Sequence, residues 1–535
     1  MKRHKPALLG LTVLCGLGQA NISHAGVGET AAGWFAAGRT TVEAAARREA
    51  NRHRAKNVIL FVGDGMGINT VTAARILEGQ LRGESGEENV LAFETLPHVA
   101  LAKTYNTNQQ TPDSAGTMTA MMTGVKTRAG LINVDQTVPR GDCAASRSKA
   151  LISFLEQAEM AGMATGVVTT ARLTHATPAA TYAHSPDRDW EDDHDLTDEA
   201  RANGCKDIAR QLIEFPYGDG IEVALGGGRR SFWPRNLADP EYPNRTGKRL
   251  DGRNLTREWV ARHARAAFVW NKAQFDAIDP RKTRHLLGLF DHSHMKYAAD
   301  REGDTGGEPS LAEMTGKAID ILQRNRKGFF LMVEAGRIDH AHHAGNAYRA
   351  LTETIELAAA VKMALDKVDP KTTLIIVTAD HGSVFTIAGY PTRGNPILGK
   401  VVGNDRQGDP RRDFARAADG RPYTTLGYAN GRGFATLETG GDSRYREPLA
   451  AGRVTDLTAI DTEDEGFHQE ALVPLPAATH AGGDVAIYAG GPGAYLVNGV
   501  VEQNVIYHVM ARATGLSSPA DAAGEKDRLH RHEKD

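Results

Sequence analysis

The chain has 535 residues, of which 41% are hydrophobic and 24% are charged, and its formal net charge is −3. This length allows a large buried core and suggests more than one domain. The near balance of charge gives no reason to expect nucleic acid or an anionic membrane surface as a partner, although it says nothing against a local site built from metal ions.

The first 25 residues are typical of a secretory signal peptide. Residues 1–5 are basic, residues 7–17 are apolar, and small residues precede the expected cleavage after Ala25. The apolar run is too short to span a bilayer comfortably, and a short amphipathic helix is the less favoured alternative. No later segment has the roughly 18 consecutive apolar residues that a spanning helix requires. We therefore expect a secreted or periplasmic protein.

Short apolar runs that end in glycine or polar residues predict strands buried on both faces. These runs cover residues 58–62, 164–170, 223–225, 329–333 and 374–378. Helix-like stretches lie between them, for example at 150–160 and 348–363. Strands and helices that alternate in this way predict an α/β/α sandwich around a largely parallel central sheet.

Residues 385–475 are unusually rich in Gly, Arg, Asp and Pro, with strand-like pieces at 423–428 and 433–437. We expect an inserted surface subdomain there, after which residues 485–488 return to the sheet. The charge of the C-terminal tail argues against a hydrophobic anchor signal. The expected division is a signal peptide (1–25), a main domain (26–384 plus 476–515), the inserted subdomain (385–475) and a charged tail (516–535).

Acidic side chains follow three of the predicted strands. Asp64, Glu334 and the pair Asp380 and His381 come where an apolar run has just ended. In open α/β sheets, ligands collect beyond the carboxyl ends of the strands. This placement favours a common site for these residues.

Asp339 and His343 are four residues apart after a predicted strand. On a helix they would project from one face and could bind one ion. His480 would complete a site with three ligands and an open position, which is typical of catalytic zinc.

Asp380 and His381 form a second pair that Asp64 could complete. Because Asp64 could also bridge to the oxygen-rich Glu334, a third and harder ion such as magnesium is expected there. These residues could also have purely structural roles. Asp64 and Asp380 could cap helices, and residues 340–343 could form a solvated helix face. Together, in strand order, the residues favour a metal site.

Ser114 stands where residues 115–122 could begin a helix, and two roles are open to it. It could be an N-cap serine. It could also be a nucleophile, because a helix N-terminus favours an oxyanion and a coordinated zinc would lower the pKa of the hydroxyl. Two metals about 4 Å apart could then stabilise the entering and leaving oxygens of a phosphoryl transfer. Arg188 and Arg172 are the candidates to clamp the remaining oxygens.

Cys143 and Cys205 would remain after cleavage of the signal peptide. In an oxidising compartment a disulfide is the simplest expectation for such a pair. A metal site built from two isolated cysteines is less favoured.

With these motifs the chain resembles the alkaline phosphatases, and it resembles the animal-type branch more closely than the short enteric bacterial form. The resemblance runs from about Lys56 to about Ala513. The motifs that carry it are Val62-Gly-Asp-Gly-Met-Gly67, Asp113-Ser-Ala115, His175-Ala-Thr-Pro178, Glu334-Ala-Gly-Arg-Ile-Asp-His-Ala-His-His343, Thr378-Ala-Asp-His381 and Thr479-His-Ala-Gly482.

The resemblance implies a phosphomonoesterase that works through a covalent phosphoserine at Ser114, with two zinc ions and one magnesium ion. Arg188 matches the phosphate-clamping arginine of the family better than Arg172. The implied ligands are Asp339, His343 and His480 for one zinc, Asp64, Asp380, His381 and Ser114 for the other, and Asp64, Thr177 and Glu334 for magnesium. His175 and His340 match the animal-type histidines that surround the magnesium ligands, which implies a strongly alkaline pH optimum and a dependence on magnesium.

The animal-type enzymes also bind a fourth ion, usually calcium. The matching positions are Glu241, the carbonyl group of Phe290, Asp291 and Glu308. The sequence departs from the family here, because Asp291 replaces a glutamate, Glu308 replaces an aspartate and extra residues separate them. The ligand atoms are still all oxygen, which suits calcium.

The resemblance further implies a disulfide between Cys143 and Cys205, and a homodimer. In the animal-type enzymes the region that matches residues 385–475 lies near the dimer interface, and Tyr390 looks like the interface tyrosine. Small phosphomonoesters are the expected substrates.

Two other kinds of function are weighed against this one. A phosphodiesterase or sulfatase of the same superfamily is the main alternative, but diesterases usually have a threonine nucleophile and lack the third metal, and sulfatases need a modified cysteine. A non-catalytic metal- or phosphate-binding protein would have a broken ligand set, whereas every expected ligand type is present here.

Overall fold

The computed structural model describes residues 30–433, 453 and 456–516. The predicted signal peptide, the strand-like residues 434–437 and nearly all of the charged tail lie outside the described residues. The chain divides into two compact units, one ending at Glu49 and one beginning at Ala50. The described part of the first unit contains helix α1 (Ala31–Ala46), which buries none of its residues.

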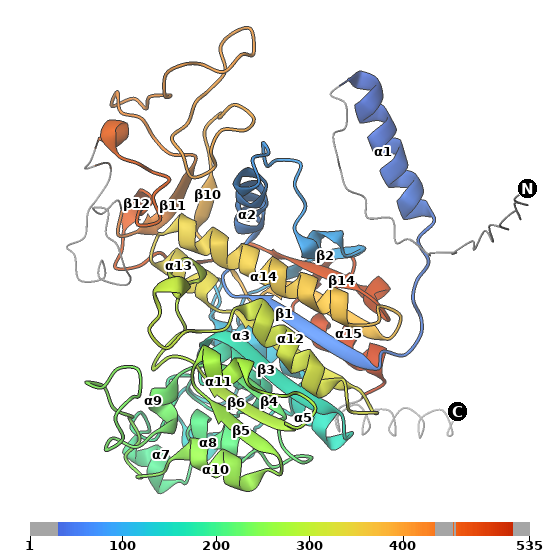
Figure 1. Cartoon of the computed structure of the whole chain (residues 1–535), viewed down its shortest axis with the longest axis vertical. Helices are drawn as coiled ribbons and strands as arrows, with labels where there is room; N and C mark the ends of the chain where they lie inside the picture. Colours follow the sequence, from blue (N-terminus) through green and yellow to red (C-terminus); the bar gives the residue numbers. More distant parts are fainter. Residues whose placement is uncertain (1–29, 434–452, 454–455, 517–535) are drawn as a thin grey trace, which may run out of the picture. The chain divides into compact units, whose positions relative to one another are not determined.

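The second unit is built on a sheet of ten strands (Figure 1). In the order β15-β2-β14-β8-β1-β7-β3-β4-β6-β5, all neighbours from β8 to β5 are parallel, whereas β14 is antiparallel to both of its neighbours. The strands are β1 (Asn57–Gly63), β2 (His98–Lys103), β3 (Ala164–Arg172), β4 (Val223–Gly227), β5 (Ala266–Val269), β6 (His285–Leu289), β7 (Phe329–Ala335), β8 (Thr373–Ala379), β14 (Val485–Gly490) and β15 (Val500–Glu502).

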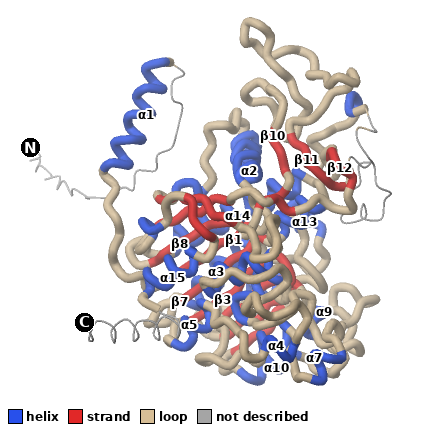
Figure 2. The backbone as a smooth tube through the Cα atoms, turned by 180° about the vertical axis from the view of Figure 1, so that it is seen from behind, coloured by secondary structure: helices blue, strands red, loops and turns tan. Residues whose placement is uncertain are grey.

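Helices cover both faces of this sheet. On one face, α12 (Leu311–Leu322) and α14 (Ala347–Lys367) pack on the central strands (Figure 1). On the other face, the layer contains α3 (Ser114–Thr123), α5 (Phe154–Met160), α6 (Ala176–Tyr182) and α15 (Val505–Thr514) (Figure 2). Every residue of β7 and β8 is buried, which is why these strands are almost continuously apolar. The predicted α/β/α sandwich around a largely parallel sheet is confirmed.

Further helices connect these elements. The described residues include no helix that is long and apolar enough to cross a membrane. A disulfide joins Cys143, at the start of α4, to Cys205, which follows α7, as predicted. The bounds of these helices are α2 (Ile68–Leu81), α4 (Cys143–Ser146), α7 (Asp198–Ala202), α8 (Ile208–Ile213), α9 (Arg229–Phe232), α10 (Leu255–Arg262), α11 (Lys272–Asp276) and α13 (Arg337–His343).

Helix α5 begins later than the sequence predicted. The apolar pattern from residue 150 suggested an earlier start, but Ser153 caps the helix. Its hydroxyl accepts a hydrogen bond from the backbone N–H of Glu156 at 3.1 Å, and the Glu156 carboxylate accepts one from the backbone N–H of Ser153 at 2.7 Å. This reciprocal pair fixes the boundary, so residues 150–152 lie outside the helix. The helix predicted at 348–363 lies inside α14.

Residues 385–475 hold a small sheet apart from the central one (Figure 1). Its strands are β10 (Phe385–Ile387), β11 (Leu426–Gly431) and β12 (Ala471–Pro474). The strand predicted at 423–428 overlaps β11 but begins three residues later than expected. The division of the chain into a main domain and an inserted subdomain at residues 385–475 remains a prediction. Just before and after this region, β9 (Gly382–Ser383) pairs antiparallel with β13 (His480–Ala481).

A pair of buried carboxyl groups lies near the amino end of β3. Thr165 donates from its hydroxyl to Glu159 at 2.5 Å and from its backbone N–H to Glu222 at 2.7 Å. Burial is the largest cause that raises both pKa values, to about 9 for Glu159 and about 8 for Glu222, and the negative charge of Glu222 raises that of Glu159 further. The folded protein therefore holds a proton here that the unfolded chain releases near its ordinary pKa.

The pair should make the protein less stable as pH rises. A carboxyl group whose pKa is raised by folding contributes stability at low pH, and this contribution is lost as pH increases above the ordinary pKa of 4.5. Glu159→Gln removes the ionisable group and should raise the unfolding temperature at pH 9 more than at pH 6, measured by calorimetry. Glu84→Gln, at an exposed glutamate, is the control. An equal effect of Glu159→Gln at both pH values would contradict the expectation.

Candidate active site

The carboxyl ends of the central strands bring three acidic residues together. Asp64 follows β1, Glu334 is the second-last residue of β7, and Asp380 follows β8. The parallel register pairs Val62 with Glu334 and Gly63 with Ala379, so the three side chains meet at the same edge of the sheet. All three are buried.

The first cluster contains Asp339, His343 and His480. Asp339 and His343 lie one turn apart on α13, with His343 Nε2 3.0 Å from Asp339 Oδ2. The pairing of β13 with β9 brings in His480, whose Nε2 lies 3.6 Å from Asp339 Oδ1 and 3.2 Å from His343 Nε2. Two ring nitrogens this close to one carboxylate form a group that could hold a cation.

The second cluster surrounds His381. Its Nε2 lies 3.4 Å from Asp64 Oδ1, 3.3 Å from Asp380 Oδ2 and 3.3 Å from Ser114 Oγ. The ring also stacks on His480, with 3.6 Å between the ring centroids, so the two clusters are adjacent.

The histidine rings are oriented to present one nitrogen to these clusters. The Nδ1 atoms of His343, His480 and His381 lie 2.5, 2.7 and 3.2 Å from the backbone carbonyls of Ala478, Pro112 and Gly382 respectively. A ring that donates its Nδ1–H to a carbonyl leaves Nε2 free to bind a metal ion, and this arrangement is usual for metal ligands. The residues therefore fit two metal ions.

The third cluster is rich in oxygen. Ligand atoms of Asp64, Glu334 and His175 lie within 4.8 Å of one another. Both carboxylate oxygens of Asp64, Oε1 of Glu334 and the hydroxyl of Thr177 are buried without a hydrogen-bond partner among the described residues. Thr169, which the sequence did not single out, donates to the other oxygen of Glu334.

Burial and neighbouring negative charges raise the pKa values of the carboxyl groups in this cluster. Burial raises the pKa of Asp64 well above its usual value, and the carboxylates of Asp380, Asp339 and Glu334 raise it further. Burial is also the largest cause that raises the pKa of Glu334, to about 8. Buried carboxylates without partners are costly unless a cation accompanies them. The cluster therefore fits a hard divalent ion.

Ser114 is the first residue of α3, and Asp113 is the N-cap. Asp113 Oδ1 accepts a hydrogen bond from the backbone N–H of Gly116 at 3.1 Å, so the capping role that the sequence left open for Ser114 belongs to its neighbour. Ser114 Oγ is left at the positive end of the helix, beside His381.

Arg188 contacts Asp113, the residue before Ser114, whereas Arg172 contacts Glu191 and His294. Arg188 Nη1 donates to Asp113 Oδ2 at 3.2 Å and Nη2 lies 3.3 Å from His175 Nε2. Although burial opposes it, the charge of Arg188 holds the pKa of Asp113 below its usual value. Arg172 instead makes two hydrogen bonds to Glu191, at 2.7 and 2.6 Å, so of the two it is Arg188 that contacts the N-cap residue Asp113.

Three histidine rings gather beside the oxygen-rich cluster. His175, His340 and His294 make edge contacts, with ring centroids 4.1 to 5.5 Å apart. Burial, followed by the charges of Arg188 and Arg172, lowers the pKa of His175 to about 3. The sequence did not indicate His294, because it lies in a loop without a motif. His175 lies close enough to Asp64 and Glu334 to touch an ion directly.

Gly65 allows the loop after β1 to close over the first two clusters. Its φ is +69°, in the left-handed region that favours glycine. A Cβ atom here would lie 2.8 Å from Ser383 Oγ and 2.9 Å from Asp339 Oδ1. A larger residue would therefore push Asp339 away from its histidines.

A separate acidic cluster lies at the positions that the sequence suggested for calcium. Ligand atoms of Glu241, Asp291 and Asp304 lie within 4.8 Å of one another. Glu308 is joined to this region through its hydrogen bond from the backbone N–H of Lys296. Asp304 was missed, because it lies among the extra residues between Asp291 and Glu308. Phe290, also predicted here, is fully buried beside Asp291.

The chain is similar to known phosphatases over most of its length. The model of the family described as alkaline phosphatase matches residues 55–516. The tissue-nonspecific alkaline phosphatase of Gallus gallus is 46% identical over 470 residues, covering 86% of this chain and 85% of that protein. The corresponding isozyme of Homo sapiens is 42% identical over 486 residues, covering 89% and 87%. The solved alkaline phosphatase of Thermus thermophilus has 25% identity and a TM-score of 0.60, covering 89% of this chain and 94% of that one.

Proposed function

The chain belongs to the alkaline phosphatase family and is a phosphoric monoester hydrolase, and we propose that it works through a covalent phosphoserine at Ser114. The observation that carries this proposal is the position of the Ser114 hydroxyl. It lies at the first residue of a helix, 3.3 Å from a histidine nitrogen that faces two buried carboxylates.

The proposed centre holds two zinc ions and one magnesium ion. Nitrogen-rich ligand sets suit zinc and oxygen-rich sets suit magnesium. When bound, such ions lower the pKa of a coordinated hydroxyl and stabilise the charge that develops on phosphoryl oxygens. The proposed ligands are Asp339, His343 and His480 for one zinc, Asp64, Asp380, His381 and Ser114 for the other, and Asp64, Thr177 and Glu334 for magnesium.

In the first step, Ser114 Oγ attacks the phosphorus atom. A bond forms between Oγ and phosphorus while the bond from phosphorus to the ester oxygen breaks. The Ser114 hydroxyl gives up its proton to water, and the leaving alcohol takes up a proton from water. The N-terminus of α3 favours the negative charge on the attacking oxygen. Arg188, which Asp113 orients, binds the oxygens that do not take part in bond exchange.

In the second step, a water oxygen attacks the same phosphorus atom. The bond between Oγ and phosphorus breaks, the serine oxygen takes up, through solvent, the proton that the attacking water gives up, and inorganic phosphate leaves. Both steps are in-line displacements at one phosphorus, so the same oxygen-binding groups serve both. We propose that His175 and His340 act beside the magnesium ligands; of the two, His175 is near enough to Asp64 and Glu334 to contact the ion as well.

The monoester preference can be tested with substrates that share one aryl leaving group. We expect kcat/KM for the phosphate monoester to exceed that for the diester and the sulfate by at least about 10³-fold, since the site is built to bind a terminal phosphoryl group with three free oxygens. Elemental analysis of the same protein should find zinc and magnesium. Faster diester or sulfate hydrolysis would favour a phosphodiesterase or sulfatase, and bound metal without turnover would indicate a binding protein.

We also infer that the chain is secreted, with its first 25 residues as the signal peptide. We further infer that it forms a homodimer. Tyr390 is 92% exposed, and exposed aromatic side chains are typical of interfaces. Sedimentation of the wild type should give a dimer, and Tyr390→Ala should shift it toward the monomer. A wild-type monomer at micromolar concentration would contradict the inference.

A further inference from the structure

The acidic cluster away from the active site contains an ammonium group of its own. The cluster consists of Glu241, Asp291, Asp304 and Glu308. The side chain of Asp291 is 5% exposed, and those of Glu241 and Asp304 are 1% exposed. Four carboxylates so well shielded from water need compensating positive charge.

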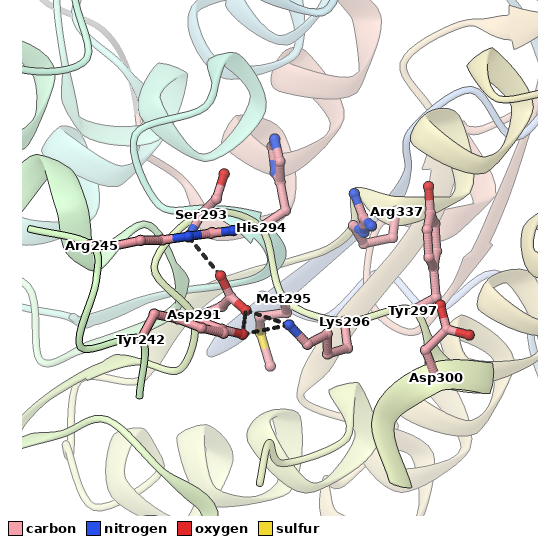
Figure 3. A pocket seen from close by; sticks show the side chains of 10 residues that line it. All are labelled: Tyr242, Arg245, Asp291, Ser293, His294, Met295, Lys296, Tyr297, Asp300 and Arg337. Carbon is pink, nitrogen blue, oxygen red and sulfur yellow. Dashed lines mark hydrogen bonds and ion pairs between the residues drawn. The ribbon is translucent and has the colours of Figure 1, made fainter. Parts of the chain in front are cut away.

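Lys296 supplies part of this charge. Its Nζ lies 3.0 Å from Asp291 Oδ2 and 3.7 Å from Asp304 Oδ1, and it donates a hydrogen bond to the hydroxyl of Tyr242 at 2.5 Å (Figure 3). The backbone N–H of Lys296 donates to Glu308 Oε2 at 2.8 Å, so the residue is fixed at the cluster by its main chain as well.

One ammonium group leaves several oxygens of the cluster without a hydrogen bond. Glu241 Oε1, both carboxylate oxygens of Asp304 and Glu308 Oε1 are buried and make no hydrogen bond among the described residues. Arg229 contacts the other oxygen of Glu241, but it also makes two hydrogen bonds to Asp239, at 3.1 and 3.0 Å. The positive charge of Arg229 is therefore shared between Glu241 and Asp239. These oxygens of the cluster therefore form an all-oxygen site that fits a divalent cation such as calcium.

The ammonium group has room to move. A cavity of about 240 Å³ is lined by Lys296 and Asp291, and also by Tyr297 and Asp300, which do not belong to the acidic cluster. Figure 3 shows Lys296 between Asp291 on one side and Tyr297 and Asp300 on the other. The Lys296 side chain is 34% exposed, in contrast to the carboxylates that it contacts.

We propose that Lys296 is a resident counter-ion of the acidic cluster, and that a divalent cation displaces it toward this cavity as it binds Glu241, Asp291, Asp304 and Glu308. A divalent ion among the carboxylates would repel an ammonium group held at the same oxygens. Lys296 therefore stabilises the protein without the ion and weakens binding of the ion. The proposal concerns a lysine and a fourth carboxylate outside the phosphoserine mechanism and does not depend on it.

The test compares wild type and Lys296→Gln by calorimetric titration with Ca²⁺, in calcium-free buffer that contains zinc and magnesium. Because a like charge is removed, the variant should bind Ca²⁺ at least about tenfold more tightly. Without calcium it should unfold at a lower temperature than wild type, and saturating calcium should remove this difference. Asp304→Asn should weaken Ca²⁺ binding by a similar factor.

Lys282→Gln, at an exposed lysine 3.9 Å from Asp279, is the matched control and should change neither quantity. Unchanged or weaker Ca²⁺ binding by Lys296→Gln would overturn the proposal. If that variant does not fold without calcium, Lys296→Arg gives a second measurement. Arginine keeps the positive charge, so its Ca²⁺ affinity should stay within about threefold of wild type, and a larger increase would overturn the proposal.

Discussion

Replacing Ser114 with alanine is expected to reduce kcat for phosphate monoesters by about 10⁴-fold or more, as removal of a covalent nucleophile does in other enzymes. The Ser114 hydroxyl, 3.3 Å from His381 Nε2, is the group that would accept the phosphoryl. The measurement is kcat at saturating aryl phosphate. Mass spectrometry after acid quenching should detect a phosphoryl group on the wild type and none on the variant.

Ser310→Ala is the matched control, because Ser310 is a serine that does cap a helix. Its hydroxyl accepts a hydrogen bond from the backbone N–H of Glu313 at 3.1 Å, at the start of α12. Its loss should cost about 1 kcal/mol of stability and leave turnover unchanged. Since Asp113 caps α3, Ser114→Ala should cost less stability than this. Turnover by Ser114→Ala within about tenfold of wild type would rule out the covalent mechanism.

Part of the site could be predicted because it follows from local rules. Parallel strands end at the same edge of a sheet, and this brings Asp64, Glu334 and Asp380 together. The spacing of Asp339 and His343 places them on one face of α13. His480 was proposed as the third ligand of this site, but no local rule brings it there, since its position depends on the pairing of β13 with β9 across about a hundred residues.

The remaining features of the site depend on tertiary contacts that the periodicity of the sequence does not predict. From its position alone, Ser114 could be a helix cap or a nucleophile. In the structure Asp113 is the residue that caps the helix. Arg172 and Arg188 were both candidates from the residues, and only the resemblance favoured Arg188; in the structure, Arg172 makes two hydrogen bonds to Glu191. Asp304 lies in an irregular loop, where only the folded chain brings it to its partners.

Asp64→Asn is expected to remove two metal ions from the protein with one substitution. Ligand atoms of Asp64 lie within reach of two clusters, one with Asp380 and His381 and one with Glu334 and His175. Asparagine keeps the volume of the side chain but supplies no negative charge to either. Elemental analysis should therefore find less of both proposed ions, the second zinc and the magnesium, and activity should fall by more than the roughly 100-fold that loss of an outer metal partner costs.

Asp339→Asn separates this expectation from a general loss of structure. Asp339 lies with His480 and His343 in the first cluster, so its substitution should lower zinc and leave magnesium unchanged. Both aspartates are buried, and any non-specific damage should be similar in the two variants. If Asp64→Asn kept its magnesium, or if Asp339→Asn lost it, Asp64 would not be the shared ligand. The two metal contents therefore test the bridging role of Asp64 independently of catalysis.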